Sequence, residues 1–289
     1  MFLFGYYLAF FYYRDRIWIS SIVPQIFPAD PTKKDLYLAA WEGYLTGNLY
    51  QELFEELKDY YKRAITLGPD QYTQRRYFKY LDEGLATHLA LAFSHFSDFN
   101  FESDLFKLFW KTKNAKRYKE FISFIGRSCI SRQNAGEWIK ANNIDVEKLK
   151  QFWDWALANC GDPEALVGFA FWIETEWNIF DPVWLAKHVR LTLEKTQGNL
   201  EWDHGIMQSL AIMAESAPED TLKILKLYLL GQKGVSSRPW LYVDDELMSI
   251  FRSLYKNPLA KEDAERLINE LLPVGSGQFW KLKDVINGK

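Results

Sequence analysis

The chain of 289 residues is long enough for one large or two ordinary domains with a buried core. Its hydrophobic fraction of 48% excludes both a disordered chain and a membrane-embedded one, and its net charge of -3 disfavours a general nucleic-acid binder, which is usually basic. Aromatic residues are unusually frequent, at 17%. Because large rings bury much area per residue, we interpret them as core packing between thin helical layers rather than as an aromatic binding surface.

The segment Met1–Tyr13 is apolar and aromatic, and no charged residue precedes Arg14. It is too short to span a bilayer and has neither the basic lead nor the cleavage site of a signal peptide. We interpret residues 1–30 as a helical edge that continues from a missing upstream part. Such an edge exposes the apolar surface meant for its neighbour. We therefore expect the isolated chain to self-associate, and to become monomeric when the preceding helices are supplied.

The next residues predict a short buried helix over 36–45, a break at Gly47 and a longer amphipathic helix over 49–67. We expect Trp41 to be buried at the centre of this pair, because Gly43 is small enough to let a neighbouring helix approach. In the helix before them, three large residues at helical spacing are expected to share one face: Trp18, Ile22 and Ile26.

Further helices are predicted over 72–96, 102–111 and 115–129. The first of these carries two apolar faces, which indicates neighbours on both sides. The polar passage 131–144 lacks the Pro/Gly/Ser run of a linker, so we interpret it as a bend within one helical-repeat domain spanning 31–289.

In the second half, three predicted helices begin with a proline beside acidic residues, which suit the positive end of a helix: Pro163, Pro182 and Pro218. These starts recur about 20 to 35 residues apart, as do the helices of HEAT-like arrays. No stretch shows the sustained alternation of a strand. The predicted fold is therefore all-α, a right-handed HEAT-like helical-repeat array (α-solenoid).

No motif for chemistry stands out. The chain has no glycine-rich phosphate loop, no dinucleotide fingerprint and no H-E-x-x-H. Cys129 and Cys160 do not have metal-ligand spacing, and we interpret them as buried, reduced thiols of a cytoplasmic protein, with a single bridge as the alternative. His88 and His95 share a helical face, where packed and hydrogen-bonded histidines are favoured over a metal or acid/base role. We therefore predict no catalytic, cofactor-binding or metal-binding residue, no cofactor and no enzymatic activity.

Two clusters are candidate contact surfaces. The first is a basic face over Lys107–Arg132 with interleaved aromatic residues, which could track a phosphate backbone; its members are Lys107, Lys111, Lys116, Arg117 and Lys119. We favour a solvated face whose aromatic residues point inward. The second could form an aromatic and acidic groove for a peptide or protein, although packing between helices is favoured; its members are Trp172, Glu174, Glu176, Trp177 and Trp184.

Three segments carry a family resemblance: Phe10–Trp18, Ile22–Phe27 and Ala39–Leu45, the last with the core Trp41-Glu42-Gly43-Tyr44-Leu45. They are similar to the helical C-terminal region of large bacterial multidomain proteins that carry a sirtuin-like or nuclease effector before a STAND-type NTPase. The tail from Ala264 to Leu282 resembles how such regions end. Between these parts the resemblance is one of architecture.

The resemblance implies a non-catalytic sensing or scaffolding region of an anti-phage defence protein. Such a region would recognise an invader's component, or other parts of the same protein, and control the attached effector. No effector or NTPase motif falls within these residues, so no catalytic residue is carried over. Two alternatives stay open: a free-standing helical-repeat adaptor for a peptide or protein, and a nucleic-acid contact module using the Lys107–Arg132 face. A protein partner is expected and a membrane is not.

Overall fold

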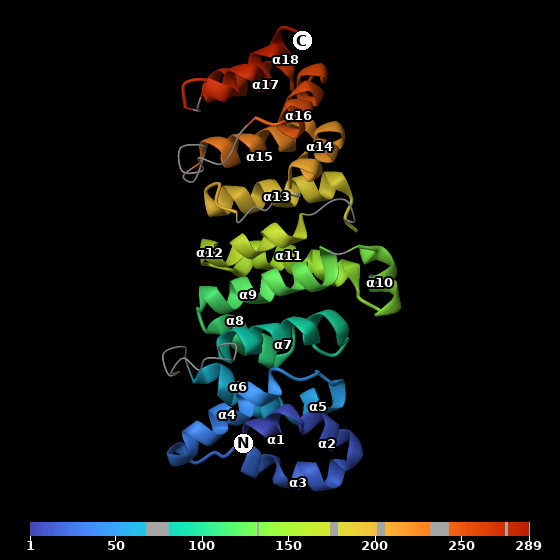
Figure 1. The fold of residues 1–289 in the computed structure, drawn as a ribbon, viewed down its shortest axis with the longest axis vertical. Helices are drawn as coiled ribbons and strands as arrows, with labels where there is room; N and C mark the ends of the chain where they lie inside the picture. The colour runs from blue at the N-terminus through green and yellow to red at the C-terminus, as the bar shows by residue number, and fades with distance from the viewer. Residues whose placement is uncertain are drawn as a thin grey trace. The chain divides into compact units, whose positions relative to one another are not determined.

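The computed structural model describes residues 1–67, 81–131, 133–173, 179–200, 206–231, 243–274 and 277–288. Over these ranges every regular element is a helix and no strand forms, so the expected all-α class is confirmed. The chain divides into two compact units, Met1–Phe124 and Ile125–Lys289 (Figure 1). The expected bend at 131–144 falls inside the second unit and stays a prediction.

The first unit is built around α4, which lies against α1, α3 and α7. Its elements are α1 (Phe2–Tyr6), α2 (Leu8–Arg14), α3 (Arg16–Ile26), the 3-10 turn η1 (Pro31–Lys33), α4 (Lys34–Tyr44), α5 (Gln51–Glu56), α6 (Lys58–Thr66), α7 (Leu81–His95), α8 (Asp104–Lys111) and most of α9 (Ala115–Ile125).

Trp41 occupies the centre of this unit. Its side chain is fully buried, as expected from the sequence, and its ring lies 4.9 Å from the rings of both Phe27 and Tyr61. Burying an indole and its neighbouring rings stabilises a fold by several kcal/mol, on the order of 3–5 for tryptophan. The core of the first unit is therefore an aromatic cluster centred on α4.

The long helix expected over 49–67 is two helices. α5 and α6 meet at Leu57, whose backbone leaves helical geometry with φ -90° and ψ 3°. Backbone bonds to Leu53 and from Tyr61 still span the break, and all three side chains are buried, so the apolar stripe continues. Neither glycine nor proline marks this bend, and the sequence pattern therefore gave no sign of it.

The face of α3 that carries Trp18, Ile22 and Ile26 is only partly turned to the core. Ile19, Val23 and Ile26 point into the core, whereas Trp18 is 45% exposed. α7 agrees with its predicted two apolar faces, because nearly every residue on it is buried. The part of the expected 72–96 helix that precedes Leu81 lies outside the described residues.

The second unit is a double row of helices. α11, α13, α15 and α17 pack side by side, and α14, α16 and α18 form the other row (Figure 1). Its elements are the π-helical turn η3 (Gly126–Ile130), α10 (Ala135–Ala141), α11 (Val146–Asn159), α12 (Pro163–Leu166), the 3-10 segment η4 (Val167–Trp172), α13 (Pro182–Thr196), α14 (Ile206–Ser216), α15 (Pro218–Leu230), α16 (Asp245–Lys256), α17 (Lys261–Leu271), the 3-10 segment η6 (Gly277–Leu282) and α18 (Lys283–Ile286).

The helix starts in this unit confirm the sequence pattern. α12, α13 and α15 each begin at the expected proline. Asp162 accepts a backbone hydrogen bond from Glu164, and Asp181 accepts two, from Val183 and Trp184. These carboxylates satisfy N–H groups that the first turn leaves unpaired, which fixes where each helix begins.

Both cysteines are buried free thiols. Burial raises the pKa of the Cys160 thiol above its ordinary value, because the low-polarity surroundings disfavour the thiolate. A raised pKa keeps the Cys160 thiol protonated and weakly nucleophilic at neutral pH.

Candidate protein interface

Exposed apolar side chains concentrate at one place in the described structure. Sixteen large hydrophobic side chains are strongly exposed, and nine of them fall within residues 1–18. Their exposed fractions run from 40% to 87%. The nine are Met1, Leu3, Phe4, Tyr6, Tyr7, Phe10, Tyr13, Ile17 and Trp18. The other seven are scattered singly along the chain, as on any protein surface.

The half-buried ring of Phe11 joins the aromatic members of this set. Its centroid lies 6.2 Å from those of Phe4 and Tyr7, 6.0 Å from that of Phe10 and 5.9 Å from that of Trp18. These are ordinary distances for interacting aromatic rings. We call the nine exposed side chains together with Phe11 the aromatic face.

Two glycines hold α1 against α4 and so fix the aromatic face in place. A Cβ at Gly5 would lie 1.9 Å from the carbonyl oxygen of Ala40, and a Cβ at Gly43 would lie 2.1 Å from that of Phe2. No side chain fits in either gap, so the two backbones are in direct contact. With Gly5 turned inward, the larger residues of α1 point outward. The face is thus presented by a firmly docked helix.

The charged side chains within residues 1–18 are Arg14, Asp15 and Arg16, which form a charged margin between Tyr13 and Ile17. The guanidinium of Arg14 lies 5.2 Å from the ring centroid of Phe10, and that of Arg16 lies 5.3 Å from that of Tyr12. Asp15 accepts a hydrogen bond from the backbone N–H of Trp18 at 2.9 Å and caps α3. The margin therefore carries both signs of charge and the face itself is uncharged.

The expected basic face is not uniformly available to a phosphate. Arg117 is only 1% exposed: its Nε donates to Asp82 at 2.6 Å and its Nη1 donates to the carbonyl oxygen of Ile65 at 2.8 Å. This member is corrected to a core residue, since a planar guanidinium buried next to a carboxylate satisfies both groups.

The lysines of that cluster remain at the surface. Lys107 pairs with Glu102 at 2.7 Å and Lys116 with Glu83 at 3.2 Å. Lys111 is exposed and Lys119 is half-buried. The interleaved aromatic residues Phe106 and Tyr118 are buried, as the solvated-face interpretation expects. Arg132 lies outside the described residues.

The aromatic and acidic cluster is also partly core. Trp172 is fully buried, with its ring stacked 6.1 Å from that of Phe180, so it cannot line a groove. Trp184 is half-buried between the ring of His188, 3.8 Å away, and the Lys150 ammonium, 5.7 Å away. Both tryptophans therefore serve packing. The remaining members lie outside the described residues: Glu174, Glu176 and Trp177.

Two buried histidines, His88 and His188, form hydrogen bonds within the fold. Nδ1 of His88 lies 2.8 Å from the hydroxyl of Tyr61. In His188, Nδ1 faces the carbonyl oxygen of Trp184 and Nε2 faces the carboxylate of Asp154, each at 2.8 Å. Both ring nitrogens of His188 thus have hydrogen-bond partners within the fold. Among the described residues, no group of three or more His, Cys, Asp or Glu side chains could hold a metal ion.

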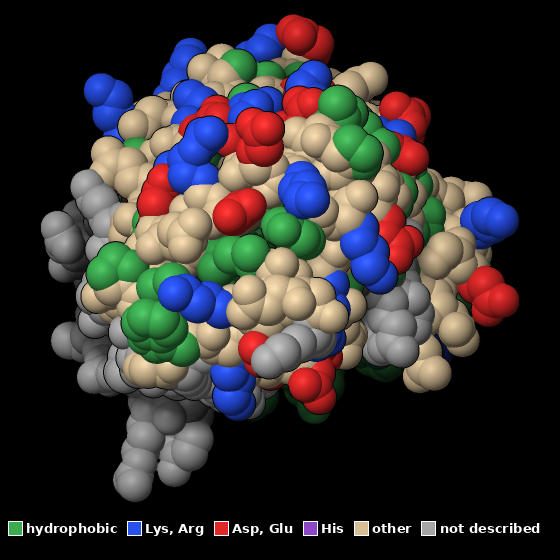
Figure 2. Space-filling view, turned by 90° about the horizontal axis from the view of Figure 1, so that it is seen from above, with side chains coloured by type: hydrophobic (Ala, Val, Ile, Leu, Met, Phe, Trp, Pro, Cys, Tyr) green, Lys and Arg blue, Asp and Glu red, His purple; other side chains and the backbone are tan. Residues whose placement is uncertain are grey.

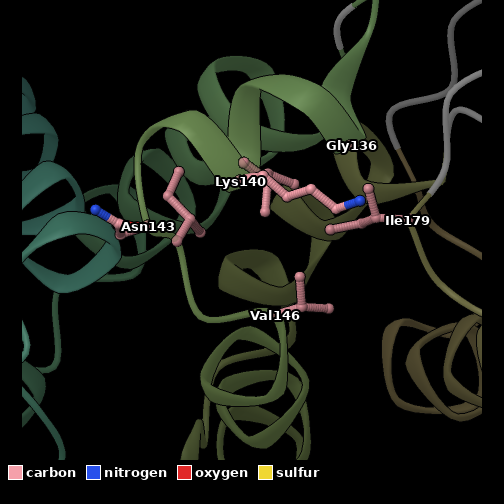
Figure 3. Close-up of a pocket in the computed structure, with 7 residues that line it drawn as sticks. Gly136, Lys140, Asn143, Val146 and Ile179 are labelled. Atoms are coloured by element: carbon pink, nitrogen blue, oxygen red, sulfur yellow. The ribbon is translucent and has the colours of Figure 1, made fainter.

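A shallow pocket of about 630 Å³ lies between α10, the start of α11 and Ile179. Figure 3 shows Lys140 reaching from α10 toward Ile179, with Val146 on the opposite wall and Asn143 directed away. Its wall is mostly aliphatic and its polar groups do not converge on one point. Its described lining residues therefore do not form a catalytic arrangement. Residues 174–178, which immediately precede Ile179, lie outside the described part.

The C-terminal end of the second unit contrasts with the aromatic face. Figure 2 looks onto it from above and shows basic and acidic side chains interspersed, with hydrophobic ones in small groups between them. Exposed Trp280 is covered on one side by the ammonium of Lys283, 4.3 Å from its ring centroid.

Comparison with known proteins adds no assignment: no protein-family model matches the chain, and neither a curated protein nor a solved structure resembles it significantly. Within the described residues, no helix is both long and apolar enough to traverse a lipid bilayer.

Proposed function

We propose that this chain is a non-catalytic scaffolding and recognition module, and that the aromatic face is its contact surface for another protein. The observation that carries the proposal is the extent of the face. The exposed fractions of its nine exposed members add up to roughly five whole large side chains, on the order of 1,000 Å² in total. Ring contacts join six of its aromatic residues into one surface: Phe4, Tyr6, Tyr7, Phe10, Phe11 and Trp18. The largest apolar patch of a typical monomer is only about 300–600 Å². Aromatic residues and a charge-depleted centre are also what protein interfaces enrich.

The architecture we propose is a HEAT-like helical-repeat array. The double row from α11 to α18 supports it, because each helix there packs on its neighbours in the row and in the chain. Arrays of this kind bind partners through surfaces instead of deep pockets.

As a biological setting we propose the C-terminal sensor region of a multidomain anti-phage defence protein in the cytoplasm. The resemblance of Phe10–Trp18, Ile22–Phe27 and Ala39–Leu45 supports this. The reading frames next to the gene test the setting. Frames for a STAND-type NTPase and an effector are expected, and unrelated neighbours would favour a free-standing adaptor.

The nucleic-acid alternative has less support than a protein partner. Arg117 is withdrawn into the core, and Lys107 and Lys116 lie beside carboxylates. Binding to a nucleic acid needs several cationic side chains that can neutralise phosphates and displace the counterions bound to them.

The size of the particle that contains this chain in an extract of its native cells tests whether the aromatic face contacts another protein. Phe10→Glu introduces a charge on the aromatic face, four residues before Arg14, where a helical Glu–Arg pair keeps α2 stable. Leu259→Glu, at a 76% exposed site in the second unit, is the matched control. We expect gel filtration of the extract to show a smaller particle for Phe10→Glu alone. Identical elution of all three chains would reject the aromatic face as a contact surface.

A further inference from the structure

We infer that the occupant of the aromatic face is a second copy of this chain, related by two-fold symmetry. The inference rests on the proposed function and names its partner. Three features of the face lead to it: its chemistry, its area and its rigidity.

The chemistry of the face is self-complementary. Over Met1–Tyr13 there is no charged side chain, so no side-chain charges repel one another there when two copies meet. The polar groups that the exposed side chains offer are the phenols of Tyr6, Tyr7 and Tyr13 and the indole N–H of Trp18. A phenol both donates and accepts a hydrogen bond, so it can pair with its own kind across a symmetry axis, as a lysine or a carboxylate cannot. A surface made for a charged partner would carry the opposite charge.

The charged margin of the face is also self-complementary. Arg14, Asp15 and Arg16 place both signs of charge next to one another. A two-fold axis brings each segment against its own copy, so arginine on one chain can face aspartate on the other. Two-fold dimers use the same patch on both subunits and need this kind of self-matching.

The area suits a dimer. A standard interface buries about 800 Å² on each partner, and the exposed surface of the aromatic face is on the order of 1,000 Å². Covering it would bury nine of the eleven strongly exposed large hydrophobic side chains described in the first unit. The other exposed large hydrophobic side chains of the described chain, such as Leu36 and Tyr50, are isolated and offer no competing patch.

Rigidity lowers the cost of association. Because Gly5 and Gly43 place backbone on backbone, α1 does not have to be ordered when the partner arrives. Binding then avoids the entropy cost of immobilising a loose segment.

Sedimentation equilibrium of the purified full chain over a range of concentrations tests the inference. We expect the mass to rise from that of one 34.1 kDa chain to twice that value and to stop there. Because the symmetry places every substitution in the interface twice, Phe10→Glu should raise the dimer dissociation constant roughly a hundredfold. Leu259→Glu should leave it unchanged, and circular dichroism should show the same helical content in all three proteins.

Several results would overturn the inference. One is a chain that stays monomeric up to roughly 100 µM. Others are a dimer that is indifferent to Phe10→Glu, or assembly that continues past two copies. Binding of the purified chain to lipid vesicles through the same residues would assign the face to a membrane instead. The purified chain could instead be monomeric while Phe10→Glu still reduces the particle size in the cell extract. That result would reject a second copy as the partner and would leave the proposed function standing.

Discussion

At the scale of single residues, Arg117 and Asp82 form a buried ion pair in the first unit. Arg117 contacts Asp82 through Nε and Nη2 and also donates to the carbonyl of Ile65, tying α9 to α7 and to the end of α6. Removing one charge leaves the other buried without a partner. Arg117→Ala should therefore lower the free energy of unfolding by roughly 3–5 kcal/mol in urea denaturation.

Two further variants separate this effect from a general loss of charge. Lys111→Ala, at an exposed site of the same cluster, should change stability by less than about 0.5 kcal/mol. The double variant Arg117→Met with Asp82→Leu should recover most of the loss, since apolar residues of similar volume can replace a buried ion pair. Equal stability of Arg117→Ala and the native chain would mean that the arginine is solvated.

Three buried tyrosines predict how the first unit responds to alkali. Burial raises the pKa of Tyr37 to about 12 and raises the pKa values of Tyr44 and Tyr61 further, because the low-polarity core disfavours the phenolate. The folded chain thus keeps these protons at a pH where the unfolded chain, with ordinary pKa values near 10, has lost them. Their contribution to stability is complete below about pH 10 and is lost as the pH rises through the folded-state values.

Above about pH 10 each such group should lower the free energy of unfolding by about 1.4 kcal/mol per pH unit, or roughly 4 kcal/mol per unit for the three together. Urea denaturation at a series of pH values measures this slope. Tyr61→Phe should reduce it by about one third. Tyr13→Phe, at an 85% exposed position, should leave it unchanged. A stability that is flat into strong alkali would contradict the burial of this cluster.

At the scale of elements, the docking of α1 on α4 depends on the absence of side chains. A methyl group at position 43 would lie 2.1 Å from the carbonyl oxygen of Phe2 and 2.7 Å from the backbone nitrogen of Tyr6. Backbone atoms cannot give way as a flexible side chain can. Gly43→Ala should therefore displace α1 and cost roughly 1–3 kcal/mol, as overpacked sites do.

Hydrogen exchange of the α1 amides checks this prediction. They should exchange much faster in Gly43→Ala than in the native chain. Gly136→Ala is the matched control, because nothing lies within 4 Å of the added Cβ. It should be neutral or stabilise α10 by up to about 1 kcal/mol, since alanine favours a helix over glycine. Unchanged protection of α1 in Gly43→Ala would mean that the contact is looser than described.

Elements also show what the sequence could and could not predict. Helix starts at Pro163 and Pro182 were predictable because capping is a local matter of one carboxylate and the next turn. The start at Pro218 has no side-chain cap and was predictable from the proline itself and the acidic first turn. The bend at Leu57 was not, since no residue there disfavours a helix. The direction in which the face of Trp18, Ile22 and Ile26 turns was not predictable, because helical spacing identifies a stripe without saying which side meets the core.

At the scale of the whole molecule, composition and periodicity predicted an all-helical chain, because both report sums over many residues. The candidate surfaces depended on long-range contacts instead. Burial of Arg117 requires Asp82, 35 positions away in the chain, to lie beside it. Burial of Trp172 requires the rings of Trp153 and Phe180. The aromatic face was visible as a run of rings, while the glycine that turns it outward was not.

The reciprocal contact of Gly5 and Gly43 has an evolutionary consequence. Each glycine is needed only while the other helix lies against it, so selection acts on the two positions as one. Lineages that keep the outward rings of α1 should retain glycine at both sites. A lineage that gains a side chain at either site loses the docking of α1 on α4. Its exposed aromatic residues then favour aggregation, and we expect polar residues to replace them. In an alignment of descendants of this chain, positions 5 and 43 should vary together, and together with the character of residues 3 to 10.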